Sequence, residues 1–111
     1  MTKEEFEQQF SKQEIDSMIE KAFQVLRKNQ GLPLMFISSE LEDNLGTCIV
    51  NITYKDIYTE KIIPLPLVEL LFTQPKLLSD DRSLAYKAKD MRTRTIVRIA
   101  WRVGNQYTHT K

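Results

Sequence analysis

TRTIVRIAWRV, residues Thr93 to Val103, is the stretch that decides the fold. It carries three arginines, Arg94, Arg98 and Arg102, each four residues from the next. Four is an even number, so a strand would place all three on one face, and four is also close to one helical turn. In either conformation the segment presents a row of guanidinium groups on one side and buries apolar side chains on the other.

The two conformations of this segment predict different architectures. Its β-branched residues favour a strand, followed by a turn at Gly104–Asn105 and a return through Gln106–Thr110. The alternative is a long C-terminal helix that Gly104 caps. The apolar side of that helix would be formed by Ile96, Ile99, Ala100 and Val103. In the helical register, however, Lys89 and Arg92 fall on the apolar side, so we favour the strand.

The best-marked helix lies near the start of the chain. Ser11 is followed three residues later by Glu14, which is a capping box, and apolar residues then recur with helical spacing as far as Leu26. Gly31 is suited to the left-handed residue that ends a helix, and Pro33 prevents its continuation. The sequence therefore predicts a long helix between Ser11 and Gly31.

The remaining elements complete an α+β fold. Residues 34–39, 47–54 and 57–63 are predicted strands of a small antiparallel sheet against which the long helix packs, with 40–46 as a loop and Lys55–Asp56 as a tight turn. Pro64 and Pro66 are expected to end the sheet. Two short helices, 67–73 and one after Ser79, would then precede the C-terminal strand 93–103.

The length and composition of the chain indicate one folded domain over residues 1–111, with 1–9 as a flexible arm or an extra turn that leads into the first helix. The chain has 111 residues, of which 41% are hydrophobic and 28% are charged. A single cysteine excludes an internal disulfide, the acidic N-terminus is unlike a signal peptide, and no apolar run approaches the roughly 18 residues that cross a bilayer. We therefore expect a cytoplasmic protein, or one inside a host cell, without membrane association.

No pattern in the sequence points to catalysis. His109 is the only histidine, Cys48 lies within a predicted strand, and the three glycines are isolated from one another. These residues cannot supply a zinc site or a phosphate-binding loop, and a pairing of Cys48 with His109 would require the C-terminus to fold back onto the sheet. We expect no enzyme activity, no cofactor and no metal.

Two features suggest binding instead. The predicted helix 67–73 is apolar nearly all round, so it needs cover from the fold or from a partner. Its candidate interface residues are Leu67, Leu70, Leu71 and Phe72. The charge is also divided: residues 1–79 carry 8 basic and 12 acidic side chains, whereas residues 80–111 carry 8 basic and 3 acidic ones. The basic candidates for contact with an anion or nucleic acid are Lys87, Lys89, Arg92, Arg94, Arg98 and Arg102.

These features support two hypotheses. The first is a small non-enzymatic interaction protein, an adaptor, inhibitor or assembly factor, which contacts a protein partner or another copy of itself. The alternative is a nucleic-acid-binding protein that uses the basic segment 87–111, in which aromatic residues such as Trp101 lie between the arginines.

Overall fold

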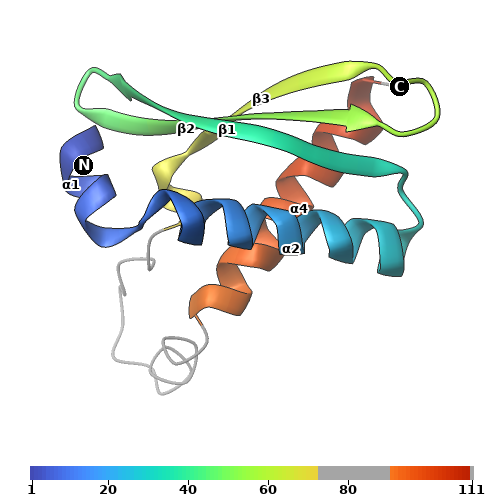
Figure 1. The fold of residues 1–111 in the computed structure, drawn as a ribbon, viewed down its shortest axis with the longest axis horizontal. Coiled ribbons are helices and arrows are strands. Elements are labelled where there is room, and N and C mark those ends of the chain that lie inside the picture. Colours follow the sequence, from blue (N-terminus) through green and yellow to red (C-terminus); the bar gives the residue numbers. More distant parts are fainter. Residues whose placement is uncertain (73–90, 111) are drawn as a thin grey trace.

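The computed structural model describes residues 1–72 and 91–110 and has an α+β architecture (Figure 1). Its elements are α1 (Lys3–Gln9), α2 (Lys12–Gln30), β1 (Leu34–Asn44), β2 (Thr47–Asp56), β3 (Ile62–Val68), the 3₁₀ turn η1 (Glu69–Leu71) and α4 (Met91–Thr110). The strands form an antiparallel sheet in the order β1-β2-β3. Helices α2 and α4 lie on the same side of this sheet and contact each other. The core fills the space between these helices and the sheet.

Both ends of α2 lie where the sequence predicted them. The hydroxyl of Ser11 accepts a 3.1 Å hydrogen bond from the backbone N–H of Glu14, and Gly31 ends the helix with a φ of 64°. Its apolar stripe is buried: Ile15, Met18, Ile19, Ala22, Phe23 and Leu26. The long helix is nevertheless the second helix of the chain, because the residues before it are helical as well.

Residues 1–9, for which we expected a flexible arm or an extra turn before the first helix, contain the separate short helix α1. Thr2 caps this helix through a reciprocal pair of hydrogen bonds with Glu5. Phe6 is fully buried and its ring packs against those of Phe10 and Phe72. Two kinds of contact therefore hold this mostly polar segment: the burial of Phe6, and the 3.1 Å ion pair between the N-terminal ammonium of Met1 and Glu69.

The strands are longer than predicted, and the third one is shifted. The predicted loop 40–46 is mostly strand, because β1 reaches Asn44 and only Leu45–Gly46 form the turn, both with positive φ. The predicted strand 57–63 begins as a turn, since the Asp56 carboxylate accepts hydrogen bonds from the backbone N–H groups of Tyr58 and Thr59. An Asp side chain that bonds the following backbone in this way stabilises a turn.

Pro64 and Pro66 lie within β3 and do not end the sheet as predicted. They stand opposite Thr53 and Asn51 of β2, and β3 is an edge strand. Because a proline has no N–H, these two positions must be the non-hydrogen-bonded pairs of the antiparallel ladder, where the backbone N points to the free edge. An edge strand accepts proline at such positions.

The chain ends in a helix, so the favoured prediction of a strand at 93–103 is wrong and the helical alternative is confirmed. Its predicted apolar side, Ile96, Ile99, Ala100 and Val103, is buried, whereas Gly104 lies inside the helix and does not cap it. Arg92, the apparent obstacle, lies in the first turn, where its guanidinium donates a 2.8 Å hydrogen bond to the Ser17 hydroxyl. The predicted helix after Ser79 falls on residues outside those described.

Candidate anion-binding face of helix α4

Helix α4 divides into a buried side and an exposed side. The exposed side carries Arg94, Arg98 and Arg102 at intervals of four residues, each partly exposed, so the predicted row of guanidinium groups is present. Two large apolar residues lie next to this row: Val97 is 55% exposed and Trp101 is 66% exposed. We call these five residues the arginine face.

Hydrogen bonds at the C-terminal half of α4 fix the direction of this face. The Tyr54 hydroxyl donates to Oε1 of Gln106 at 2.6 Å, and Nε2 of Gln106 donates to the carbonyl oxygen of Pro64 at 3.0 Å. The Tyr107 hydroxyl donates to the carboxylate of Asp56 at 2.6 Å. Helix α4 is thereby attached to β2 and β3, and Trp101 lies on the side of the helix away from the core.

The charge of this face has no acidic counterpart within its own helix. The segment 91–110 contains four arginines and neither aspartate nor glutamate. Among the described residues, Arg94 and Arg102 form no ion pair. Partial burial lowers the pKa of the Arg98 guanidinium, and the neighbouring charge of Arg94 lowers it further. Arginines one helical turn apart repel each other, and a bound anion would lower that repulsion.

The other basic candidates do not join this face. Arg92 is exposed but is directed toward α2 through its bond to Ser17. Lys87 and Lys89 lie outside the described residues. The structure therefore brings together Arg94, Arg98 and Arg102 of the six residues predicted from the sequence.

The predicted apolar interface at 67–73 is not a single surface. Leu67 and Phe72 are fully buried, Leu71 is partly buried against the core, and only Leu70 is strongly exposed, at 63%. The helical prediction was wrong because Leu67 still belongs to β3, whose residues alternate between the core and solvent, and only the short turn η1 follows. Leu67 and Phe72 thus stabilise the fold and are not available to a partner.

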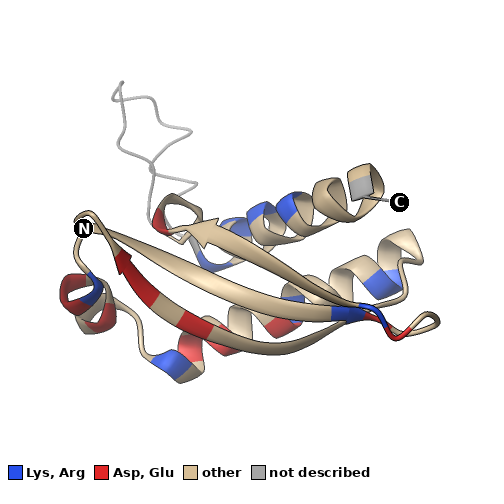
Figure 2. Cartoon of the chain, turned by 90° about the horizontal axis from the view of Figure 1, so that it is seen from above, with Lys and Arg blue, Asp and Glu red and all other residues tan. Residues whose placement is uncertain are grey.

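The outer face of the sheet is a surface that the sequence predictions missed. On β3 the residues that point away from the core are Ile62, Pro64, Pro66 and Val68, all of them apolar and exposed. On β1 the outward residues include the exposed acids Glu40 and Glu42, and Figure 2 shows acidic residues gathered along this strand. The unbroken apolar run from Ile62 to Val68 would have indicated this face, had the prolines been allowed in an edge strand.

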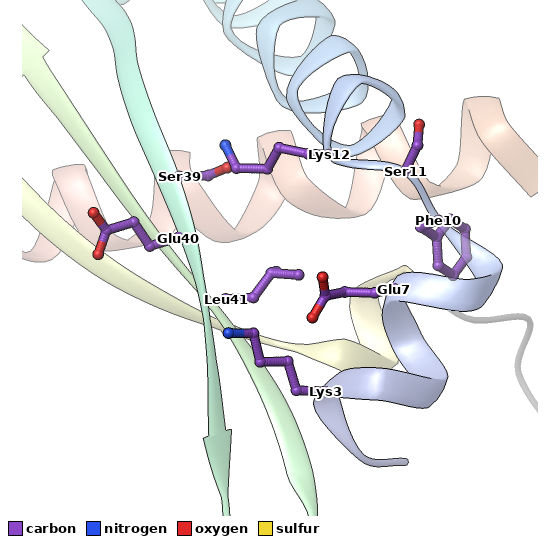
Figure 3. Close-up of a pocket in the computed structure, with 8 residues that line it drawn as sticks. All are labelled: Lys3, Glu7, Phe10, Ser11, Lys12, Ser39, Glu40 and Leu41. Carbon is purple, nitrogen blue, oxygen red and sulfur yellow. The ribbon is translucent and has the colours of Figure 1, made fainter.

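A groove of about 450 Å³ separates α1 and the start of α2 from β1 (Figure 3). Lys3 and Glu7 extend into it toward Leu41. Three of its other polar side chains already have partners in the chain: the Ser11 hydroxyl caps α2, Lys12 forms an ion pair with Asp16 at 2.9 Å, and the Ser39 hydroxyl donates to the same carboxylate. The groove holds no histidine or thiol and gathers no set of groups for a reaction.

Cys48 and His109 are the two residues that the sequence analysis considered for catalysis, and neither lies in surroundings that would activate it. Cys48 is fully buried, and this burial raises the pKa of its thiol, which disfavours the reactive thiolate. His109 is exposed, and its Nδ1 lies 2.8 Å from the carbonyl oxygen of Asn105. Within residues 1–72 and 91–110, no three His, Cys, Asp or Glu side chains gather as metal ligands.

Comparison with known proteins does not add a function to this geometry. No family model matches the chain, and searches of curated proteins and of solved structures give no match. Of the helices in the described parts of the chain, none has the length and apolar content needed to cross a membrane.

Proposed function

We propose that this is a non-enzymatic binding protein whose arginine face binds single-stranded nucleic acid. The observation that carries this proposal is the row of three guanidinium groups on an exposed helix side that contains no carboxylate. Helical rise places successive arginines of the row about 6 Å apart along the axis. A row of this kind suits the repeated phosphates of an extended backbone, and guanidinium groups match phosphate oxygens in geometry.

Trp101 is the reason to prefer a single strand. Its ring is exposed beside Arg98 and Arg102, and an aromatic face next to cationic groups can stack on an unpaired base. Bases in a duplex are stacked on one another and do not offer that contact. Binding would therefore depend strongly on salt and only weakly on base sequence.

Fluorescence anisotropy of a labelled single-stranded oligonucleotide tests the proposal. At about 50 mM salt we expect binding, and Arg94→Glu/Arg102→Glu should abolish it because two phosphate contacts become repulsive. Trp101→Ala should weaken binding by roughly 5- to 150-fold, the range of about 1 to 3 kcal/mol that a stacked base contributes.

The matched control is Lys55→Glu/Lys61→Glu, which makes the same change of net charge in β2 and directly before β3. This control should retain most of the affinity, since it leaves the arginine face intact. The proposal is wrong if the wild type does not bind at low salt. It is equally wrong if the control loses as much affinity as the arginine variant.

A protein partner is the second candidate, and the outer face of the sheet favours it. Ile62 is 55% exposed and Val68 is 43% exposed, with the two prolines of β3 between them. A continuous apolar strip on a surface is typical of a protein contact. The predicted interface at 67–73 no longer supports this candidate, because two of its four residues are buried.

A further inference from the structure

The outer face of the sheet has two parallel strips. Across the strands, Glu40 stands beside Asn51, which stands beside Pro66, and Glu42 stands beside Ile49, which stands beside Val68. An acidic strip on β1 and an apolar strip on β3 are therefore separated by the width of two strand spacings, about 10 Å. Glu40 and Glu42 are exposed and lie about 7 Å apart along the strand.

The arginine face carries the complementary pair of strips. Arg94, Arg98 and Arg102 form one strip, and Val97 with Trp101 forms an apolar strip next to it. The axial interval between arginines, about 6 Å, is close to the interval between the two glutamates. If the two surfaces were placed against each other, the arginines would pair with the glutamates, and the apolar side chains of α4 would contact those of β3.

These two surfaces lie on opposite sides of the molecule. Helices α2 and α4 cover the inner face of the sheet, so the outer face is turned away from them (Figure 1). Trp101 and Val97 are on the side of α4 away from the core. Within the described residues, one copy therefore cannot bring its own two surfaces into contact, whereas two copies can.

We propose that the outer face of the sheet binds the arginine face of a second copy of this chain. The occupant is a second copy because α4 presents arginines on a helix that contains neither aspartate nor glutamate, beside exposed apolar side chains, and these complement the acidic and apolar strips of the sheet face. Two different surfaces form the contact, so it is head-to-tail, and each added copy leaves one surface of each kind unoccupied. Such contacts produce open chains of variable length, or rings if the geometry closes.

Self-association and nucleic-acid binding would use the same face of α4 and so would exclude each other. A bound oligonucleotide should release copies from the ends of a chain, and assembly should lower the apparent affinity for the oligonucleotide. The self-association itself does not depend on the proposed function, because the sheet face and α4 are complementary without any nucleic acid.

Sedimentation velocity over a range of concentrations, up to about 1 mM for contacts of modest affinity, tests this inference. At about 50 mM salt the wild type should increase in mean mass with concentration, and at about 1 M salt it should become monomeric because the ion pairs are screened. Glu40→Lys/Glu42→Lys and Arg94→Glu/Arg102→Glu should each lower the association constant at least about tenfold, since each places like charges together.

The decisive variant combines all four substitutions in one chain. Both surfaces then have reversed charge and are complementary again, so association should return. A structural defect would not be repaired in this way, and circular dichroism should show that each variant is folded. A wild type that stays monomeric at low salt overturns the inference, and so does a fourfold variant that stays monomeric while folded. Association without oligonucleotide binding would uphold this inference and reject only the proposed function.

Discussion

The hydroxyl of Tyr54 in β2 and the side-chain amide of Gln106 in α4 are joined by a 2.6 Å hydrogen bond. The same amide also donates to the backbone carbonyl of Pro64 in β3, at 3.0 Å. One glutamine therefore connects two strands and the C-terminal helix. Together with the buried apolar side of α4, this contact orients the helix so that its arginines lie on the side away from the core.

Alkaline pH should weaken this attachment. Burial raises the pKa of Tyr54 to about 12, from the ordinary value of 10. The hydrogen bond to Asp56, together with burial, raises the pKa of Tyr107. The unfolded chain loses these protons near pH 10 while the folded chain keeps them, so the stabilisation is complete below pH 10 and disappears as the pH rises to about 12.

Urea unfolding at pH 8, 10 and 11.5 measures this effect. The free energy of unfolding should fall between pH 10 and 11.5 in the wild type. Tyr54→Phe should be less stable than the wild type at pH 8 and should show a smaller fall, because one of the two titrating groups is gone. An equal fall in both proteins would mean that Tyr54 does not contribute.

Gly104→Ala should stabilise the protein. Gly104 lies in the interior of α4, where glycine costs about 1 kcal/mol relative to alanine. An added Cβ would be 3.5 Å from Cδ2 of Leu26, which is an ordinary contact distance. Thermal or urea unfolding should show an increase of about 1 kcal/mol or slightly less. A loss of stability would show that α2 and α4 need the smaller residue where they meet.

Truncation of Leu70, within η1, and truncation of Phe72, directly after it, should have unequal effects. Phe72 is fully buried against Phe6, so Phe72→Ala should lower the free energy of unfolding by about 3 to 5 kcal/mol. Leu70 is 63% exposed, so Leu70→Ala should change it by less than about 1 kcal/mol. Urea unfolding of the two variants compares them directly. Similar losses of stability in the two variants would contradict the burial of Phe72 and the exposure of Leu70.

Cys48 should resist alkylation while the protein is folded. Its side chain is fully buried, and its raised pKa leaves little thiolate at neutral pH. Iodoacetamide at pH 8 should therefore modify it much more slowly in buffer than in urea, and mass spectrometry can follow the reaction. Equal rates in the two conditions would show that β2 opens readily at this position.

Local signals predicted α2 well because both of its ends carry residues with strong positional preferences. Ser11 and Gly31 each satisfy backbone groups that only a helix terminus leaves open. The segment 93–103 offers no such signal, since a spacing of four is compatible with a strand and with a helix. Tertiary contacts decide between them: Ile96, Ile99 and Val103 are buried together only when the segment is helical.

The residues of the candidate site could therefore be predicted from the sequence, but the surfaces around them could not. The sequence alone placed Arg94, Arg98 and Arg102 on one side of their element, which the structure confirms. It could not predict the outer face of the sheet, because the prolines in β3 imitate a strand terminus. Their acceptance depends on β3 being at the edge, which is a property of strand order and not of local sequence.

Those same prolines limit how the sheet can grow. At Pro64 and Pro66 the free margin of β3 offers no amide hydrogens, so an incoming strand from another molecule would find half of its usual donors missing. The addition of a strand from another molecule to this edge, which is the first step toward fibrillar aggregates, is therefore suppressed. The protein can therefore expose an apolar strand at the edge of its sheet, while another molecule that meets this edge is limited mainly to side-chain contacts.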